Sequence, residues 1–385
     1  MYPTVVITSA VPWEGITARP HHLARQLAGR GWPVLFVEPP VTLIGPFRNP
    51  SLRARMLPRH PIADVNIRQD TDVKVLKPVT TLPFYHVVRW INRFNQRLLA
   101  RQIRQHVTGP IILLSNLPSS VDMIPWLSPI ATFYDCVDDH GAFGGLVRRD
   151  VIDSLEAEMA YASRTVFATA DALAERMQSL HSHVQLVPNA VELDHFRKTF
   201  NASEHPDLSD IASPRVGFIG GIGSWLDFDL IRNLATARPN MEFVFVGPVE
   251  TDVTAVRALP NVHFLGRKPY DELPQFLAGF DLCLYPFANN KLTESVNPVK
   301  VYEYLAAGKE VLATPTREMR KFVDHVWIIN NSDEGASAID MILRGKRKDS
   351  PALRQPFLQE QTWESRGKQI EAALLQHLPT SFSLN

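Results

Sequence analysis

The chain has 385 residues, which is more than one ordinary folding core and suggests two domains. Lysine plus arginine and aspartate plus glutamate number 40 each, so the formal net charge is zero and no general attraction to nucleic acid is expected. A hydrophobic fraction of 45% and a charged fraction of 21% are ordinary for a soluble globular protein.

The cysteine content and the first residues bear on the compartment. Cys136 and Cys283 each lie inside an apolar, strand-like run, so we expect a reducing compartment and no disulfide framework. The start, MYPTVVITSA, has no basic segment and no long apolar stretch, so no signal peptide is expected. No apolar run approaches the roughly 20 residues that a membrane-spanning helix needs. We therefore expect a cytoplasmic protein.

In the first half of the chain, short β-branched runs alternate with helical patterns. Apolar strands separated by helices are typical of a parallel sheet that is covered on both faces. The predicted strands are 5–9, 34–38, 73–76, 111–115, 131–137, 165–169 and 184–188, and the predicted helices lie near 18–30, 86–107, 119–127, 150–162 and 171–180.

A second series of the same kind follows a polar stretch near 198–214. We therefore predict an α/β fold with two Rossmann-like, doubly wound parallel-sheet domains, 1–198 and 199–360, and a C-terminal helix in 361–385 that crosses back to the first domain. Such sheets bind ligands at the carboxyl ends of their strands, so we expect the two domains to face a cleft there. The predicted strands of the second domain are 215–220, 241–247, 261–266, 281–287, 310–314 and 326–330.

The first predicted strand is followed by a loop that contains Trp13 and Gly15, and then by a helix with the adjacent His21 and His22. These two histidines are too isolated to indicate a metal site. His22 is a candidate base in the predicted cleft, and the alternative is a capping or surface role. Trp13 and Gly15 are candidates for the acceptor side of such a cleft.

The predicted helix near 86–107 is rich in arginine and contains no acidic residue. Arg89, Arg93 and Arg97 follow one another at i, i+4 spacing along one face. With the acid-free segment 47–60, they form a candidate patch for anionic lipid headgroups or pyrophosphates. The alternative is the solvated outer face of a helix that packs on the sheet.

The segment FYDCVDDHGAFGG delivers acidic residues to the end of a predicted strand. Asp138 and Asp139 follow Asp135 there, next to His140. Carboxylates crowded at a strand end can have a raised pKa, which suits a general base, so Asp139 and Asp138 are candidate catalytic residues. The alternatives are an acidic motif that binds a hard cation, or one aspartate that caps the next helix and another that is solvated.

Glycines follow the first predicted strand of the second domain in the segment FIGGIGSW. Gly220 and Gly221 allow backbone N–H groups to approach a phosphate closely, next to a helix N-terminus. The dinucleotide-binding pattern G-x-G-x-x-G is absent. The alternative is a turn that is rich in glycine for steric reasons alone.

The segment NPVKVYEYLAAGKE predicts a short helix with Asn297 as N-cap, Pro298 at the first position and Gly308 just past the end. Lys300 and Glu303 share one side of this helix at i, i+3 spacing. The Glu303 carboxylate can accept hydrogen bonds from vicinal hydroxyls such as those of a nucleotide ribose. The alternative is an intrahelical Lys300–Glu303 pair.

These motifs together resemble GT-B glycosyltransferases, especially bacterial glycosyltransferase family 4 and related cell-surface polysaccharide transferases. The resemblance extends over nearly the whole chain and is most specific in NPVKVYEYLAAGKEVLAT. Less specific marks are RPHHLARQLAGRGWPVLFVEPP, FYDCVDD, VPNAVELDHF and TWESRGKQIEAAL. The resemblance implies the transfer of a sugar from a nucleotide-sugar, held mostly by the second domain, to an acceptor, with no metal required.

The resemblance also implies roles for individual residues. Glu303 would bind the donor ribose, and Gly220, Gly221 and the Asn297 turn would approach the diphosphate. Lys300 or Lys291 would offset the charge of the leaving group.

The chain departs from family 4 at two places. Many members have a sugar-contacting glutamate eight positions before the ribose glutamate, whereas this chain has Ser295 there and Glu294 beside it. The usual phosphate-binding arginine and lysine are absent from GGIGSWLD. An inverting mechanism with Asp139 or Asp138 as base is therefore an alternative to the retaining mechanism.

We therefore predict a hexosyltransferase that uses a UDP- or GDP-linked sugar, without cofactor or metal, in cell-surface or exopolysaccharide biosynthesis. Its acceptor would be lipid-linked or a polysaccharide, and the basic helix would hold it peripherally at the inner face of the plasma membrane. The alternatives are a nucleotide-sugar 2-epimerase, an NAD-dependent oxidoreductase that uses Glu38 as its ribose-binding acid, and an inactive binding protein.

Overall fold

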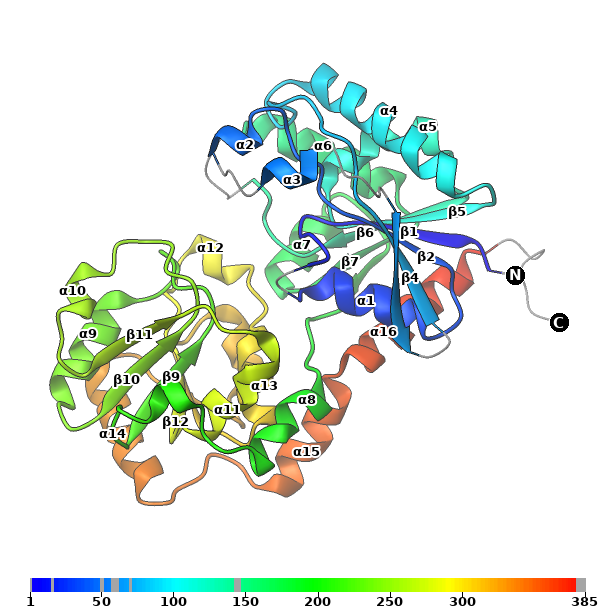
Figure 1. Ribbon diagram of the computed structural model, residues 1–385. Helices are drawn as coiled ribbons and strands as arrows, with labels where there is room; N and C mark the ends of the chain where they lie inside the picture. Colours follow the sequence, from blue (N-terminus) through cyan, green and yellow to red (C-terminus); the bar gives the residue numbers. More distant parts are fainter. Residues whose placement is uncertain are drawn as a thin grey trace. The chain divides into compact units, whose positions relative to one another are not determined.

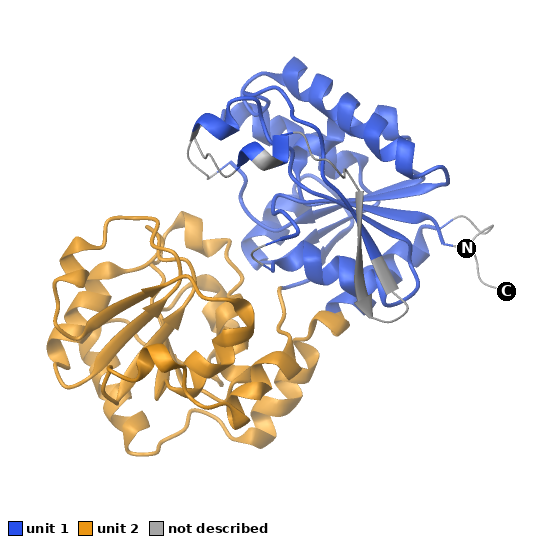
Figure 2. Cartoon of the chain, in the orientation of Figure 1, with its two compact units in different colours: residues 1–188, 366–385 blue, residues 189–365 orange. Residues whose placement is uncertain are grey.

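The computed structural model describes residues 2–14, 17–48, 52–56, 62–68, 71–141 and 147–378. The chain divides into two compact units, which are residues 1–188 with 366–385 (unit 1) and residues 189–365 (unit 2) (Figure 2). The division falls before the predicted boundary at 198, because residues 189–198 belong to unit 2 together with the whole polar stretch; Val191 and Phe196 are buried in an apolar core there. Leu208 and Ile211 of that stretch are buried in an apolar core of unit 2.

Unit 1 contains a sheet of eight strands among the residues described, in the order β3-β4-β2-β1-β5-β6-β7-β8. All neighbouring strands pair in parallel except β3 and β4, which are antiparallel. The antiparallel edge strand β3 was not predicted from the sequence. The strands are β1 (Thr4–Thr8), β2 (Val34–Val37), β3 (Ile62–Arg68), β4 (Thr71–Leu76), β5 (Ile111–Ser115), β6 (Ala131–Cys136), β7 (Thr165–Ala168) and β8 (Val184–Leu186).

Helices cover both faces of the unit 1 sheet (Figure 1). Side chains alternate along β1, so that Val5 and Ile7 pack in the core formed with α1 and α16, whereas Val6 packs in the core formed with α4 and α5. The helices are α1 (Arg19–Ala28), α2 (Gly45–Arg48), α3 (Arg53–Met56), α4 (Arg89–His106), η2 (Pro118–Met123), α5 (Ile124–Leu127), α6 (Arg149–Ala162), α7 (Asp171–Gln178) and α16 (Trp363–Gln376).

Unit 2 contains six strands in the order β11-β10-β9-β12-β13-β14, all paired in parallel. Each strand is short and almost wholly apolar, as expected for a sheet that is buried on both faces. The strands are β9 (Arg215–Ile219), β10 (Glu242–Val246), β11 (Val262–Gly266), β12 (Leu282–Tyr285), β13 (Val311–Ala313) and β14 (Trp327–Ile328).

Alternating residues of β9 point to two cores in unit 2 as well. Phe218 packs with α9, α10 and α14, whereas Ile219 packs with α8, α11, α13 and α15. The helices are α8 (Leu193–Arg197), η3 (Lys198–Asn201), η4 (Pro206–Leu208), α9 (Phe228–Ala237), α10 (Thr254–Arg257), η5 (Tyr270–Glu272), α11 (Leu273–Ala278), α12 (Lys291–Glu294), α13 (Val299–Ala306), η6 (Arg317–Phe322), α14 (Ser332–Leu343) and α15 (Pro351–Glu360).

The predicted fold class is confirmed: each unit has a doubly wound, mainly parallel sheet. The predicted helix 119–127 is instead a 3-10 turn followed by the short helix α5. Pro125 lacks a backbone N–H and therefore favours a new helix start at this point. Within the described part of the chain, no helix combines the length and the apolar character that crossing a bilayer requires.

Candidate active site

The carboxyl edge of the unit 2 sheet contains two backbone turns in close contact. Strand β9 ends at Ile219 and continues into Gly220 and Gly221. Beside it, β10 ends before Gly247, where an added Cβ atom would lie 1.8 Å from the carbonyl oxygen of Gly220. Only glycine therefore fits at position 247, and this contact fixes the path of the Gly220–Gly221 turn.

Helix α13 brings a charged pair to this turn. Lys300 Nζ lies 2.9 Å from Glu303 Oε2, and the Glu303 side chain is almost fully buried. A Cβ atom added to Gly220 would lie 3.7 Å from Lys300 Cε, so the lysine side chain runs next to the turn. Lys300 therefore lies between Glu303 and the Gly220 turn. The intrahelical Lys300–Glu303 pair, which was the alternative from the sequence, is also formed.

A tyrosine that sequence reasoning missed fixes α13 to the sheet. The buried Tyr304 hydroxyl accepts a hydrogen bond from Ile219 N (2.8 Å) and donates one to Ile219 O (3.2 Å). Because Ile219 precedes Gly220, this side chain holds the glycine turn against the helix that carries Lys300 and Glu303. Its position directly after Glu303 was the only signal in the sequence.

Asn297 has a different role from the predicted one. Pro298 occupies the N-cap position of α13, and no side chain caps this helix. Asn297 is buried; its Oδ1 accepts a hydrogen bond from Asn189 N (3.0 Å), and its Nδ2 donates one to Glu318 (2.9 Å). The helix starts one residue later than predicted, because the buried carboxylate of Glu318 and the backbone of Asn189 engage the side chain that would otherwise cap it.

The two remaining candidates of unit 2 lie on or next to α12. Lys291 is exposed at the start of that helix, and the half-buried Ser295 follows its last residue. Among the described residues, no hydrogen bond or ion pair joins either side chain to Lys300 or Glu303. The contacts therefore favour Lys300 over Lys291 as the cation beside the glycine turn.

In unit 1, the first acidic residue of FYDCVDDHG is buried at the end of β6. Asp135 forms an ion pair with the buried Arg19 of α1, with three N–H···O contacts of 2.9 to 3.1 Å. Asn116 Nδ2 donates a further hydrogen bond of 2.7 Å to Asp135. Asp135 therefore joins the sheet to α1 and is not available to a ligand.

Asp139 is held by two arginines. Arg176 Nη1 of α7 lies 3.1 Å from its Oδ1, and Arg149 Nη2 of α6 lies 3.8 Å from its Oδ2. Arg176 also pairs with Glu156 at 3.0 Å, and Glu156 accepts a hydrogen bond from Tyr134. Asp139 is therefore a member of a polar network that joins α6 and α7 to β6.

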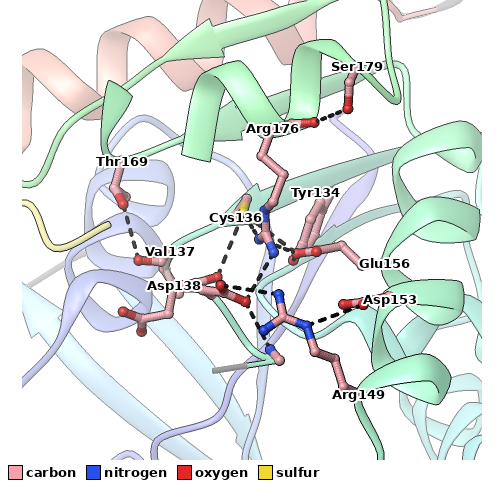
Figure 3. A network of polar contacts seen from close by, with 12 residues as sticks. Tyr134, Cys136, Val137, Asp138, Arg149, Asp153, Glu156, Thr169, Arg176 and Ser179 are labelled. Atoms are coloured by element: carbon pink, nitrogen blue, oxygen red, sulfur yellow. Dashed lines mark hydrogen bonds and ion pairs between the residues drawn. The ribbon is translucent and has the colours of Figure 1, made fainter. Parts of the chain in front are cut away.

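Asp138 lies outside this network, with its carboxylate turned away from both arginines (Figure 3). In the ranges that the structure describes, no ion-pair partner faces this carboxylate. Burial and, to a smaller extent, the nearby negative charge of Asp139 raise the pKa of Asp138 to about 6. A carboxylate with such a pKa can accept a proton near neutral pH, which makes Asp138 the better candidate base of the two.

Two buried polar atoms near Asp138 have unused hydrogen-bonding capacity. The His140 ring bonds to the main chain of Asn116, but His140 Nε2 and Asn116 Oδ1 have no partner among the described residues. Burial lowers the pKa of His140 to about 4, so its imidazole is neutral at physiological pH. These atoms lie at the carboxyl ends of β5 and β6, where α/β sheets bind ligands.

Comparison with known proteins finds a family match within unit 2. Residues 213–344 match the family described as "Glycosyl transferases group 1". Residues 213–344 are referred to as the group 1 domain, after the family that they match. The matched residues include the Gly220 turn, Lys300 and Glu303, and they end within unit 2.

A curated relative matches a larger part of the chain than the group 1 domain. TuaH of Bacillus subtilis (strain 168) is 29% identical over 241 residues, and its name assigns it provisionally to teichuronic acid biosynthesis as a glycosyltransferase. The match covers 58% of this chain and 59% of TuaH. The chain thus spans about three fifths of the length of the curated relative that it matches.

Several solved structures have the same fold over nearly the whole chain, and not only over the group 1 domain. HepE of Anabaena, solved with UDP and glucose, has a TM-score of 0.67 at 14% identity and covers 97% of this chain and 100% of its own. An E. coli protein solved with UDP-2-fluoro glucose has a TM-score of 0.69 at 11% identity and covers 98% and 100%. A UDP-forming trehalose-phosphate synthase of Burkholderia vietnamiensis has a TM-score of 0.68 at 13% identity and covers 100% and 98%. The chain has their GT-B fold.

Outside the group 1 domain, the two histidines of α1 have separate roles. His21 Nδ1 accepts a hydrogen bond from Ala18 N (3.0 Å), and its Nε2 donates one to Pro12 O (2.9 Å), so His21 caps the helix. His22, the predicted candidate base, is buried, and this burial lowers its pKa well below the usual value. This burial favours a structural role for His22.

The loop after β1 is anchored on β2. Trp13 N donates a hydrogen bond of 2.9 Å to the buried Glu38, and its ring packs on Phe36 at 4.9 Å. Arg55 also bonds to Glu38, at 2.9 Å. The Glu38 carboxylate is therefore engaged by the protein and is not available to the ribose of a dinucleotide. Gly15, the other predicted loop residue, lies outside the described residues.

The three arginines of the predicted patch on α4 have different surroundings. Arg89 pairs with Asp122 of η2 and Glu158 of α6, each at 2.7 Å, so it connects three elements of unit 1. Arg93 is 67% exposed, and the Arg97 guanidinium lies 4.3 Å from the ring of Trp126. Because two acidic side chains from neighbouring elements engage Arg89, the contacts favour Arg93 and Arg97 over Arg89 for binding an anionic ligand.

Metal binding has little support in the acidic motif. Within the described ranges, no group of three or more His, Cys, Asp or Glu side chains has an arrangement that could hold a metal ion.

Proposed function

We propose that the chain is a glycosyltransferase that moves a sugar from a UDP-linked donor to a hydroxyl of a lipid-linked or polysaccharide acceptor. The observation that carries the proposal is the Lys300–Glu303 pair beside the Gly220 turn, inside the group 1 domain. It places a cation, a buried carboxylate and the backbone of the Gly220–Gly221 turn at the carboxyl edge of one sheet. A nucleoside diphosphate needs these three kinds of group.

Each part of the donor would meet one of these groups. Glu303 would accept hydrogen bonds from the ribose hydroxyls. Lys300 and the Gly220 turn would both contact the diphosphate. The structures of similar fold were solved with UDP, UDP-glucose or UDP-2-fluoro glucose, which supports uracil as the base.

The reaction would exchange one bond at the anomeric carbon of the sugar. The acceptor oxygen forms a bond to that carbon while the bond from carbon to the diphosphate oxygen breaks, and UDP leaves. Lys300 stabilises the negative charge that develops on UDP. Asp138 accepts the proton of the acceptor hydroxyl. His140 Nε2 and Asn116 Oδ1, which have no hydrogen-bond partner among the described residues, are available to other hydroxyls of the acceptor.

The relative TuaH supports an acceptor from the cell surface, because its name refers to teichuronic acid biosynthesis. The acceptor would then be reached at a membrane surface. The exposed Arg93 and Arg97 of α4 support a peripheral position at the cytoplasmic face of that membrane, where anionic headgroups would attract them.

The alternatives have less support. An NAD-dependent oxidoreductase would need the Glu38 carboxylate, which Trp13 and Arg55 already engage. A nucleotide-sugar 2-epimerase shares the architecture but needs no acceptor. It would therefore convert its donor in the absence of any second substrate.

A ligand screen tests the proposal. Thermal shift would be measured with UDP-, GDP- and dTDP-sugars and with NAD, on the full chain and on Glu303→Gln, with the exposed Glu360→Gln as the matched control. We expect a rise in Tm with UDP-sugars that Glu303→Gln loses and Glu360→Gln keeps. A rise with NAD alone would contradict the proposal, and donor conversion without acceptor would favour the epimerase.

A further inference from the structure

Large aromatic side chains are exposed together on α4 and α5 of unit 1. Trp90 is 64% exposed, Phe94 is 47% exposed and Trp126 is 49% exposed. Trp90 and Phe94 are one helical turn apart on α4, and α5, which carries Trp126, packs beside this helix (Figure 1). Isolated exposed apolar residues are common on protein surfaces, but a group of three aromatic residues on neighbouring elements marks an interaction site.

The surface around these rings is hollowed. Phe94 and Trp126 line a depression of 660 Å³ between α4, α5, η2 and α6. Ile124 and Pro125 add apolar walls, and Arg93 and Arg97 lie at the same depression. An apolar group therefore has a place to pack next to two guanidinium groups.

The charge of this face is positive. Helix α4 contains no acidic residue, and Arg93, Arg97 and Arg101 are exposed on the side that carries Trp90 and Phe94. The depression contains two acidic residues, Asp122 and Glu158. Arg89 lies 2.7 Å from each of them, and the exposed Arg93 lies 3.7 Å from Asp122. Because Arg89 offsets much of their charge, the outer arginines keep an excess of positive charge.

Arginines and aromatic rings alternate along the helix axis. The exposed side chains follow the order Trp90, Arg93 with Phe94, Arg97, Arg101, so they form a stripe of about three turns, or roughly 16 Å. The Arg97 guanidinium stacks on Trp126 at 4.3 Å, which holds both groups at the same level. Aromatic and basic side chains at one level match the boundary between lipid headgroups and acyl chains.

We propose that this stripe, made of Trp90, Arg93, Phe94, Arg97, Arg101 and Trp126, seats unit 1 in the surface of an anionic lipid bilayer. The rings lie at the level where headgroups meet acyl chains, and the arginines bind lipid phosphates. The purpose of the contact, to reach a membrane-borne acceptor, rests on the proposed function. The bilayer is favoured over a protein partner because the positive charge fits anionic lipid and the pattern runs parallel to one helix.

Vesicle co-sedimentation of the full chain tests the stripe. Vesicles of phosphatidylcholine with phosphatidylglycerol would be compared with phosphatidylcholine alone, for the wild type and for Trp90→Ser/Phe94→Ser and Arg93→Gln/Arg97→Gln. We expect binding to the anionic vesicles that each double variant weakens roughly tenfold or more. The controls are Leu353→Ser, an exposed apolar side chain of α15, and Arg344→Gln, an exposed arginine of unit 2, and both keep wild-type binding.

Two further measurements separate the possible failures. Circular dichroism and the UDP-induced thermal shift show whether a variant folds and keeps its donor site, so loss of vesicle binding alone supports the stripe. Wild-type binding by both double variants would overturn the proposal, as would a dimer in sedimentation velocity that only Trp90→Ser/Phe94→Ser dissociates, because the stripe would then bind a second copy. A wild type that binds vesicles but no UDP-sugar would contradict the proposed function and leave the stripe intact.

Discussion

Arg176 Nη1 lies 3.1 Å from Asp139 Oδ1, whereas the carboxylate of the preceding residue, Asp138, points away from this arginine (Figure 3). Two neighbouring aspartates of one motif therefore have different surroundings. Asp139 is fixed between α6 and α7 by two arginines, and Asp138 is half-buried without a cation beside it among the described residues. This difference separates a structural acid from a candidate catalytic one.

Replacing each aspartate by asparagine should have different consequences. We expect Asp138→Asn to lower kcat by roughly 10²–10⁴-fold with donor affinity unchanged, because the proton acceptor is lost. We expect Asp139→Asn to lower the free energy of unfolding by about 1–3 kcal/mol, because Arg176 and Arg149 lose a shared partner. Transfer kinetics and urea unfolding measure the two effects. Full turnover by Asp138→Asn would place the base elsewhere.

The pH dependence of transfer should follow Asp138. Its carboxyl group must be ionised to accept a proton, so we expect kcat/KM to rise with pH through about 6 and then level off. The rise should be absent from the residual activity of Asp138→Asn. If kcat/KM does not change between about pH 5 and pH 8, Asp138 is not the base.

The raised pKa of Asp138 also affects stability. Its ionised carboxylate destabilises the fold, whereas a carboxylate in an ordinary ion pair stabilises it. The unfolded chain has the usual aspartate pKa of 3.8, so between this value and about 6 the folded state binds more protons than the unfolded state. Asp138 therefore makes the fold less stable as the pH rises through this window. We expect Asp138→Asn to have a higher Tm than the wild type above the window, with the difference shrinking below it. An equal difference at every pH would contradict the assigned pKa.

Lys300 should contribute to donor binding through the diphosphate. We expect Lys300→Met to weaken UDP binding roughly tenfold or more and to leave uridine binding nearly unchanged, because the lost attraction acts on the phosphates alone. Lys291→Met is the matched control, since Lys291 is exposed and no described contact joins it to this pair. Calorimetry with both ligands measures the effects. An equal loss with UDP and uridine would remove Lys300 from the phosphate site.

Tyr304 should stabilise unit 2. Tyr304→Phe removes both hydrogen bonds to Ile219 in a buried environment, so we expect the free energy of unfolding to fall by about 1–3 kcal/mol. The donor site should also become looser, because Gly220 follows directly. Urea unfolding measures the first effect and UDP titration the second. A variant as stable as the wild type would show that water replaces the hydroxyl.

The fold could be predicted because its signal is local. Apolar strands such as 111–115, separated by helices, have few arrangements other than a covered parallel sheet. Strand β3 was missed because the segment around it contains no β-branched run comparable to β1. The units divide at 188 rather than 198, because the burial of Val191 and Phe196 in unit 2 depends on packing with helices far along the chain.

The site could be predicted only in part, because partners distant in sequence decide which side chains are free. Lys300 and Glu303 are three residues apart, so their pairing follows from helix geometry. Arg176 is 37 residues from Asp139, and Asp122 is 33 residues from Arg89, so the sequence could not show that these groups are engaged. Asn297 similarly lost its predicted capping role to Glu318.

The central claim is that Glu303 binds the ribose hydroxyls of a UDP-linked donor. Calorimetry would compare UDP with 2′,3′-dideoxy-UDP on the wild type and on Glu303→Gln. We predict that Glu303→Gln weakens UDP roughly tenfold or more but leaves the dideoxy analogue nearly unchanged, since the lost hydrogen bonds need the hydroxyls. An equal loss with both ligands, or no loss with either, would contradict the claim.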